Sequence, residues 1–456
     1  MAVVAKSALE RTLRLDAEFF KDDFTSALLA LSRHNLEPLT DTAKVSDGNH
    51  FTISDCYTEE GIPYYRGQDI SGTFFAEQAK ATFITPEAYQ RPYMKRSHLQ
   101  KGDVLLSIVG TIGSVSLFDS DDEATCSCKL AILRPKSILP EYLAAYLSSS
   151  FGQNRIRQLT RGALQGGLTL VDMDQFDIPR FGELEEAVAK TIQQAKAQTI
   201  AATQAQQTAE ATLIEALGLG GWSPPEPLTY TRSAAAVRIA GRFDSQFHAP
   251  AVSELELELS SKFEMVSLGE LGEVTSGRTV QYSEAGTIPI VRSGNVGKNV
   301  DPAVLLKATA AEPSFALNKG DVLISSIGFG SIGRVETVSV SGLGTVSEVT
   351  VLRQADLDPY YLAAYLRSFA GQIQIERYIT GATGQLHLYP RDVRSVFVPR
   401  IEGAAQLKFR ELAEQGELSR NRAQSLLTTA KRAVEIAIEE SEGAALAFLE
   451  AGRLAQ

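Results

Sequence analysis

Two long stretches of this chain repeat apolar side chains at helical spacing and contain no proline. Residues 183–218 are rich in Ala, Gln and Glu, which favour helix, and residues 404–440 follow the same pattern. Each predicts a helix about 54 Å long. Because such a narrow apolar seam leaves a lone helix unstable, the two are expected to pack on each other rather than to be unrelated surface helices. The seam positions are Leu184, Val188, Ala195, Ala202, Ala209, Leu213 and Leu217, then Leu412, Leu426, Ala430, Val434 and Ala437.

The segments before each long stretch read as strands and short helices. Residues 104–118 and 322–338 are β-branched and punctuated by glycine, which predicts strands joined by tight turns. One further strand is predicted in each half, and then a short amphipathic helix. The strands are 125–135 and 345–354, and the helices are 142–153 and 359–372. Each half is therefore predicted to be a mixed α+β globule.

The same string of motifs occurs twice, at an offset close to 219 residues. This period is too long for a solenoid and indicates two similar halves in tandem. The halves differ most at 35–100 and 265–318, as one scaffold carrying two recognition surfaces would. The repeated pieces are KGDVLL at 101–106 and KGDVLI at 319–324, YLAAYL at 142–147 and 361–366, Gly152-Gln153 and Gly371-Gln372, Ile178-Pro179-Arg180 and Val398-Pro399-Arg400, and more loosely LDAEFF at 15–20 and FDSQFH at 243–248.

Composition narrows the class of protein. The 456 residues are 44% hydrophobic and 22% charged, which is ordinary for a globular protein, and no apolar run is long enough to span a bilayer. With no signal peptide evident, the chain is expected to be cytoplasmic. A net charge of −11 argues against a surface coated with basic residues, although DNA recognition needs only a local positive surface.

Catalytic and metal-binding motifs are weak. Three cysteines and five scattered histidines predict no metal site. The G-x-G-x-x-G pattern at 328–333 is expected to be a turn, because strand-like residues follow it where a nucleotide site needs a helix. Asp358-Pro359-Tyr360-Tyr361 resembles an adenine-methyltransferase motif but is expected to be the start of the repeated helix. With no nucleophile and base in a convincing set, no catalysis is predicted.

Taken in order and in duplicate, these motifs resemble the target-recognition module of type I restriction-modification specificity subunits. The order is KGDVLLSIVGTIG, a Leu-Ala-Ile-Leu-Arg-Pro strand, LPEYLAAYLSSSFGQ, a Gly/Gln loop, Ile-Pro and a long helix. In the second copy, Ser331 and an extra residue pair interrupt the Gly-Thr-Ile-Gly turn, and 345–354 lacks the Arg-Pro ending. The resemblance implies an α+β fold of two tandem target-recognition domains separated by two long helices packed as an antiparallel coiled coil.

The expected domain boundaries follow the motifs. The first target-recognition domain is placed at 1–181 and the second at 236–401. The first spacer helix is placed at 182–221, with a Pro-rich linker at 222–235. The second spacer helix and a C-terminal tail occupy 402–456.

The resemblance also implies a function, partners and cofactors. Each domain is expected to read one half of a bipartite, asymmetric site in double-stranded DNA. The helices are expected to set the spacing and to dock two methyltransferase subunits, which a restriction and translocase subunit can join in phage defence. S-adenosylmethionine, and ATP and Mg²⁺ where a restriction subunit is present, are bound by these partners and not by this non-catalytic chain. No membrane partner is expected.

Polar and basic residues in loops and variable segments are the candidate DNA contacts. Arg and Lys mostly grip phosphates, and Arg, Gln and Asn can also read base edges. The alternative for each is a solvated or acid-paired surface charge. The candidates are Arg66, Gln68, Lys95, Arg96, Lys101, Arg155, Arg157, Arg161 and Gln165 in the first half, and Arg278, Arg292, Asn295, Lys298, Lys319, Gln385 and His387 in the second.

Two other functions remain open on the sequence alone. One is a two-module DNA reader that serves a different defence or methylation complex. The other is a scaffold whose modules bind protein instead of DNA, which the acidic net charge favours.

Overall fold

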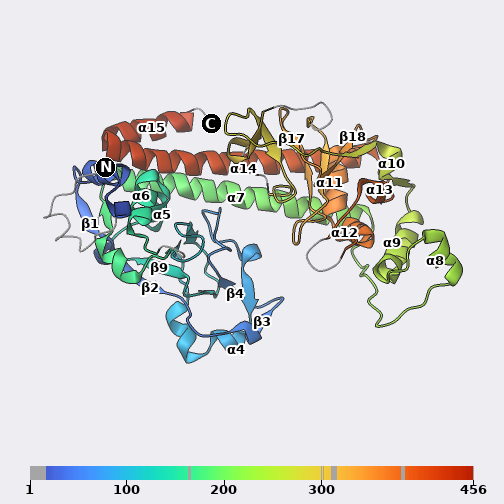
Figure 1. The fold of residues 1–456 in the computed structure, drawn as a ribbon, viewed down its shortest axis with the longest axis horizontal. Helices are drawn as coiled ribbons and strands as arrows, with labels where there is room; N and C mark the ends of the chain where they lie inside the picture. The colour runs from blue at the N-terminus through green and yellow to red at the C-terminus, as the bar shows by residue number, and fades with distance from the viewer. Residues whose placement is uncertain are drawn as a thin grey trace. The chain divides into compact units, whose positions relative to one another are not determined.

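The computed structural model describes residues 17–162, 166–298, 300, 302–309, 316–381 and 386–454. The chain divides into two compact units (Figure 1). Unit 1 comprises residues 1–200 and 419–456, and unit 2 comprises residues 201–418. Among the described residues, no helix combines the length and the apolar character that crossing a membrane requires.

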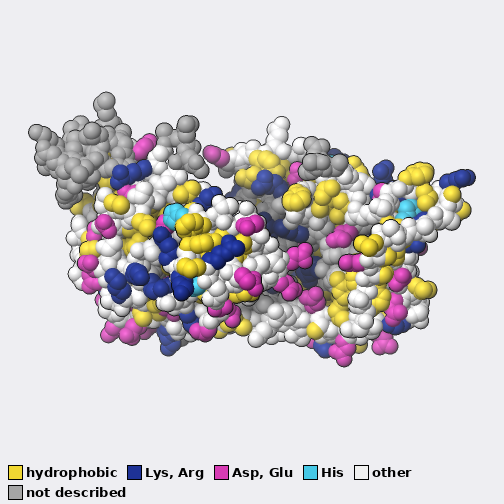
Figure 2. Space-filling model, turned by 90° about the horizontal axis from the view of Figure 1, so that it is seen from below, with side chains coloured by type: hydrophobic (Ala, Val, Ile, Leu, Met, Phe, Trp, Pro, Cys, Tyr) yellow, Lys and Arg dark blue, Asp and Glu magenta, His cyan; other side chains and the backbone are white. Residues whose placement is uncertain are grey.

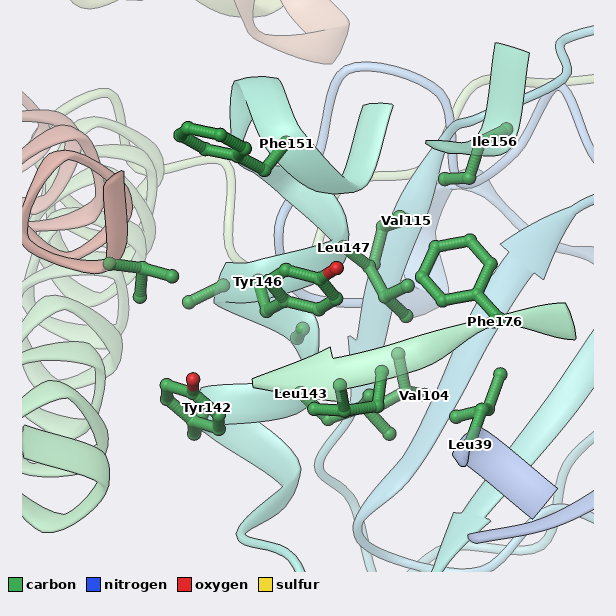
Figure 3. Packing of buried hydrophobic residues seen from close by; sticks show 14 of the residues in the cluster. Leu39, Val104, Val115, Tyr142, Leu143, Tyr146, Leu147, Phe151, Ile156 and Phe176 are labelled. Carbon is green, nitrogen blue, oxygen red and sulfur yellow. The ribbon is translucent and has the colours of Figure 1, made fainter. Parts of the chain in front are cut away.

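Unit 1 is built on a four-stranded antiparallel sheet in the order β2-β9-β6-β7. Its strands are β2 (Ala43–Asp47), β9 (Leu130–Pro135), β6 (Asp103–Ser107) and β7 (Val115–Phe118). Two short helices, α5 (Pro140–Ser148) and α6 (Ser150–Leu159), pack against it. Figure 3 shows Tyr142 and Tyr146 of α5 turned into the core, near Val104 and Val115 of the sheet. The single helix predicted at 142–153 is therefore two helices, because the chain bends at Ser149, which caps α6.

A second, smaller sheet in unit 1 has the order β3-β5-β4-β8. Its strands are β3 (Tyr57–Thr58), β5 (Thr82–Ile84), β4 (Ile62–Tyr65) and β8 (Thr125–Cys126). The prediction of one strand over 125–135 is wrong in detail. The segment splits because β8 pairs in parallel with β4, whereas β9 pairs with β2 and β6 in the main sheet. The backbone crosses between the sheets at 127–129, where Ser127 N donates to Tyr65 O at 2.9 Å.

Short elements complete unit 1. A two-stranded pairing of β1 with β10 brings its first and last strands together. The remaining elements are η1 (Ala17–Phe20), α2 (Asp22–Leu31), β1 (Leu36–Pro38), α3 (Leu39–Thr42), η2 (Ser54–Cys56), η3 (Gln78–Lys80), α4 (Pro86–Tyr89), η4 (Pro92–Ser97), η5 (Leu170–Gln175) and β10 (Asp177–Pro179).

Unit 2 repeats this topology. Its main sheet has the order β12-β18-β15-β16, its smaller sheet the order β14-β13-β17, and β11 pairs with β19. The parallel pairing of β4 with β8 recurs as that of β13 with β17. The elements are α8 (Ala234–Ala240), η6 (Gln246–His248), α9 (Pro250–Ser260), β11 (Met265–Ser267), α10 (Leu268–Leu271), β12 (Glu273–Ser276), β13 (Ile288–Val291), η7 (Pro302–Val304), β14 (Lys307–Ala308), β15 (Val322–Ser325), β16 (Val335–Thr337), β17 (Gly344–Thr345), β18 (Val349–Arg353), α11 (Pro359–Arg367), α12 (Phe369–Tyr378), α13 (Pro390–Val393) and β19 (Phe397–Pro399).

The same hydrogen bonds hold both units together. The Tyr142 hydroxyl donates to Pro179 O at 2.6 Å, and the Tyr361 hydroxyl donates to Pro399 O at the same distance. Each bond ties the first small helix to the strand that leads into a long helix. These tyrosines are fully buried, so a hydroxyl without a partner would be costly there.

An arginine–aspartate pair is repeated in the same way. Arg134 Nη2 lies 2.7 Å from Asp103 Oδ2, and Arg353 Nη2 lies 2.6 Å from Asp321 Oδ2. Both aspartates also accept a backbone N–H three residues back, which closes the turn before β6 and β15. The aspartates of the repeated Gly-Asp turns are thus structural.

The long helices are α7 (Glu183–Ala216) and α14 (Gly403–Glu439), and they pack together as an antiparallel pair. In unit 1, the 183–200 part of α7 shares a buried cluster with the 419–439 part of α14. In unit 2, Leu213 and Leu217 near the end of α7 share a cluster with Phe409 near the start of α14. The predicted fold class is confirmed.

The C-terminal segment, expected to be a tail, contains a further helix, α15 (Glu442–Leu454). Ala445 and Leu449 of α15 are buried in the core of unit 1. Glu442 Oε1 accepts the backbone N–H of Leu184 at 3.0 Å, so its carboxylate lies at the N-terminus of α7, where a negative charge is favourable.

Replacing Asp103 by Ala is expected to lower the free energy of unfolding by about 3 kcal/mol, because it leaves Arg134 without its buried partner. Urea unfolding followed by circular dichroism measures the loss. Lys101→Ala is the matched control, because its ion pair with Asp121 is exposed and should contribute under about 1 kcal/mol. Equal effects of the two substitutions would contradict the prediction.

Glu435 provides a pH-dependent test of how α14 holds α6. Burial alone would raise the pKa of Glu435, but hydrogen bonds from Ser150 and the Arg432 ion pair outweigh it and lower the pKa below the usual glutamate value. A carboxylate with a lowered pKa stabilises the fold above its unfolded pKa, and this is lost as pH falls through the folded pKa. Glu435→Gln should therefore lower the free energy of unfolding by about 1 kcal/mol at pH 7 and by much less near pH 3.

Urea unfolding at the two pH values measures this difference. Glu440→Gln, an exposed neighbour on the same helix end, is the control and should show no pH-dependent difference. If Glu435→Gln lowered the free energy of unfolding equally at both pH values, the lowered pKa of Glu435 would be contradicted.

Candidate functional site

Three loops of unit 1 meet at one place, and we call them the loop cluster of unit 1. They are 66–71 after β4, 108–114 between β6 and β7, and the described parts of 160–168 after α6. Thr111 Oγ1 donates to Gly67 O at 2.9 Å, and Leu168 N donates to Ile108 O at 2.9 Å. The third loop is closed at its base, where Arg161 and Gly167 exchange backbone hydrogen bonds.

Unit 2 forms the equivalent loop cluster from 292–298, 326–334 and the described parts of 380–387. Ser293 Oγ bonds to Ile327 O and to Ser325 Oγ, which joins the first two loops. Leu388 N donates to Ser326 O at 2.9 Å, and Thr380 and His387 exchange backbone hydrogen bonds. The scaffold therefore presents three loops of different sequence in the same frame in each unit.

The structure brings about half of the predicted contact residues into these clusters. In unit 1, the guanidinium of Arg66 is bidentate on Asp69, Gln68 is exposed, and Arg161 pairs with the buried Asp172. Gln165 lies outside the described residues. In unit 2, the members are Arg292, Asn295, Lys298 and His387, and Gln385 lies outside the described residues.

The members in unit 2 differ in exposure. Arg292 and Lys298 are exposed, whereas Asn295 is half-buried because its Oδ1 accepts the backbone N–H of Arg292 at 2.9 Å. The ring of His387 stacks on Tyr389 at a centroid distance of 5.8 Å. Tyr389 is 43% exposed, so an aromatic pair borders this cluster.

Other predicted residues lie elsewhere. Lys95 and Arg96 are exposed on η4, and Lys101 pairs with Asp121 at 2.7 Å. Lys319 is exposed in the turn before β15, and Arg278 is exposed in the turn after β12.

The two arginines of α6 point in different directions. Arg157 is exposed and donates to Asn154 Oδ1. Arg155 is directed inward, where it donates to Gln158 Oε1 at 2.6 Å and to the carbonyl of Gln175. Burial lowers the pKa of Arg155, with Asp177 nearby opposing that shift. Because its donors are used within unit 1, its role in the structure is to hold α6 to the segment before β10.

Four of these basic residues form ion pairs with acids of their own unit: Arg66, Arg96, Lys101 and Arg161. The hydrogen bonds that the Arg66 guanidinium donates to Asp69 raise the pKa of Arg66, and burial raises the pKa of Tyr65 to about 12. Tyr65 therefore stays a neutral hydroxyl at physiological pH. Pairing of this kind explains how a chain of net charge −11 keeps arginines at its loops.

The sequence predictions missed a turn beside the loop clusters. Residues 47–51 follow β2 and contact η4, where the rings of Phe51 and Tyr93 lie 4.4 Å apart. The signal was the Asp47-Gly48-Asn49 triplet, a strong turn former. The duplication does not mark this turn, because the two halves differ in this part of the chain.

Neither of the motifs set aside on sequence grounds forms a cofactor site. The glycines at 328–333 lie in a turn that leads into β16 and not into a helix. Asp358 caps α11, with Oδ1 accepting the Tyr360 N–H at 2.8 Å. Within the described ranges, no group of three or more His, Cys, Asp or Glu side chains is placed to hold a metal ion.

Together, the units define a protein that contains two copies of one α+β recognition scaffold and a pair of long helices. Residues 260–399, which form most of unit 2, match the type I restriction modification DNA specificity domain. The resemblance of this chain to type I restriction-modification specificity subunits is thus confirmed, and unit 1 repeats the topology of the matched domain.

Similar chains occur among solved structures. The S subunit of a type I restriction-modification system from M. genitalium is 15% identical, with 89% of this chain and 95% of that chain covered and a TM-score of 0.44. The HsdS subunit from Thermoanaerobacter tengcongensis is 15% identical, with 89% and 97% covered and a TM-score of 0.29. A chain from a study of type I R-M complex assembly and conformational transition is 17% identical, with 92% and 97% covered and a TM-score of 0.29. Comparison with curated proteins gives no match. The resemblance rests on the domain match.

Arg155 and Arg157 offer a test of the inward and outward positions. Arg155→Ala is expected to lower the free energy of unfolding by about 2 kcal/mol, because it removes hydrogen bonds to Gln158 and to Gln175 O. Arg157→Ala, two residues along the same helix, should change it by under about 0.5 kcal/mol. Urea unfolding checks both, and a larger loss in Arg157→Ala would overturn the placement.

Proposed function

We propose that this chain is the DNA-specificity subunit of a type I restriction-modification complex and that each unit reads one half of a bipartite DNA site. The match of residues 260–399 to a DNA specificity domain carries this proposal. The repeated topology extends the same role to unit 1. Because the loop clusters carry different side chains on one scaffold, the two half-sites differ in sequence.

The candidate DNA contacts are the exposed polar and basic residues of each unit. In the loop clusters, Arg66, Gln68 and Arg161 act in unit 1, and Arg292, Asn295, Lys298 and His387 act in unit 2. Arginine and glutamine can form paired hydrogen bonds with base edges, whereas lysine mainly contacts phosphate. Lys95, Arg96, Lys101, Arg157, Arg278 and Lys319 would add contacts outside the clusters, and Gln165 and Gln385 stay predictions. Arg155 is left out of this set.

The paired helices are proposed to fix the spacing of the half-sites and to dock two methyltransferase subunits. At 34 and 37 residues, α7 and α14 are about 51 and 55 Å long. Half-sites one DNA turn apart are separated by roughly 34–36 Å, which helices of this length can span. A helix holds a set distance and phase, which a flexible linker does not.

The chemistry is assigned to the partners. The methyltransferase subunits would bind S-adenosylmethionine, and a restriction subunit would bind ATP and Mg²⁺. The part contributed by this chain is recognition in the cytoplasm. Purified alone, it is expected to show no methyltransferase or nuclease activity.

A comparison of methylomes tests the function. Cells that lack the gene should lose one methylated, split motif from the genome, and a plasmid copy should restore it. Replacing residues 1–181 with the corresponding domain of another specificity subunit should change one half of that motif, and replacing residues 236–401 should change the other.

Two outcomes would refute the proposal. If deletion of the gene left the methylome unchanged, the proposed role of this chain in DNA methylation would be wrong. A swap that alters both halves would end the model of independent readers. Binding of the purified complex to duplex DNA should also weaken steeply with salt, because phosphate contacts release counterions, whereas a protein scaffold would bind no DNA.

A further inference from the structure

The turn after the first strand of the main sheet has the same backbone in both units but different side chains. Gly48 N donates to Leu130 O at 3.3 Å, and Gly277 N donates to Val349 O at 3.3 Å. A Cβ on Gly48 would lie 2.3 Å from Cys126 O, and one on Gly277 would lie 2.6 Å from Thr345 O. Both turns are therefore pressed against the crossing strand, and glycine is required at each.

The residues that follow these glycines are unrelated. Unit 1 has Asn49-His50-Phe51, and unit 2 has Arg278-Thr279-Val280. A fixed turn with variable side chains is the same arrangement that the loop clusters show, so the turn is a further position where the two units can differ in specificity.

In unit 1 the turn is rigid. Asn49 is 2% exposed, its Nδ2 donates to Phe51 O at 2.7 Å, and its Oδ1 accepts the Phe51 N–H at 3.0 Å. The backbone carbonyl oxygen of Asn49 also accepts the Cys128 N–H at 3.0 Å. The backbone of Phe51 is thereby fixed before any ligand arrives, which lowers the entropy cost of a contact made by its side chain.

This rigid turn presents an aromatic ring to solvent. Phe51 is 58% exposed, and the side of its ring that is covered packs against Tyr93. A single exposed apolar residue is common and has no meaning by itself. Here the ring is held on a braced turn and packs against a second ring.

Basic side chains bind the residues on either side of this aromatic pair. Arg96 and His50 both bond to the carboxylate of Asp47, with His50 Nε2 at 2.6 Å, and Arg91 Nη1 donates to the Tyr93 hydroxyl at 2.9 Å. Lys95 is exposed on the same short helix, η4. Figure 2 shows lysine and arginine side chains gathered beside histidine and apolar side chains on unit 1.

We propose that Phe51 is an apolar wedge that enters a base step of duplex DNA, with Arg96 and Lys95 on the adjacent phosphates. This inference rests on the proposed function. Proteins that bend DNA insert side chains such as Phe or Leu between base steps and hold the neighbouring backbone with cations. Asp47 is a positioning residue that orients Arg96 and His50. In unit 2, the residue that directly follows the glycine is Arg278, where unit 1 has Asn49, and Arg278 reads a base edge by hydrogen bonding.

The test compares Phe51→Ala with Phe51→Leu in the full chain together with the subunits that co-purify with it. The probe is a 40-base-pair duplex that carries the motif found by the methylome comparison, labelled with a donor and an acceptor dye at its ends. Titrations at several salt concentrations give the affinity, the salt slope and the bend. The matched control is Leu29→Ala, which removes a 62% exposed apolar side chain from α2.

Phe51→Ala is expected to weaken binding about tenfold and to abolish the bend-dependent energy transfer, with the salt slope unchanged. Phe51→Leu should keep most of the bend, and Leu29→Ala should behave as wild type. Arg96→Ala should instead reduce the salt slope by about one, because it removes a phosphate contact.

Wild-type affinity and bend in Phe51→Ala would overturn the wedge while leaving the specificity function intact. Loss of binding in Phe51→Ala with no bend in the wild-type complex would also overturn it, in favour of a surface contact. A wild-type complex that binds no duplex would overturn the proposed function and the wedge together.

Discussion

Everything in each unit depends on how two short helices are held against a four-stranded sheet. In unit 1, α5 and α6 bury Tyr142 and Tyr146 over the sheet, and the Tyr142 hydroxyl binds the carbonyl of Pro179. That bond fixes the strand from which α7 begins. The same contact in unit 2, from Tyr361 to Pro399, fixes the start of α14. A buried hydroxyl tolerates little displacement, since losing its acceptor leaves a polar group unsatisfied. The start of each long helix is thus tied to the core of its own unit.

With the scaffold fixed this way, the loops are free to differ. The loop clusters and the turns after β2 and β12 are anchored by backbone bonds and glycines that both units share. Their side chains have almost nothing in common. This division places the repeated residues in the scaffold and the unrepeated ones in its loops, the arrangement by which proteins commonly carry functional residues on a rigid frame.

Charged side chains are also paired within each unit. The net negative charge of the chain does not describe the local charge in and near the loops. Arg66, Arg161 and Arg96 each form an ion pair there with an aspartate of the same unit. Such pairs hold a guanidinium in one orientation. Its other N–H groups can still donate to a phosphate or a base. Arg155 is the exception, because its donors are consumed inside unit 1.

The sequence alone determined the duplication, the two long helices and the resemblance to type I restriction-modification specificity subunits, because these depend on periodicity and on local motifs that occur twice. It also indicated which segments carry the loops. Tertiary structure decided what no local pattern records. Residues 125–135 divide between two sheets because β8 pairs with β4 whereas β9 pairs with β2 and β6, and α15 forms because its apolar face meets the core of unit 1. Arg155 and Arg157 look alike in sequence, and Phe51 resembles any loop phenylalanine. Their directions are set by packing with residues far away in the chain, which is the information a one-dimensional pattern lacks.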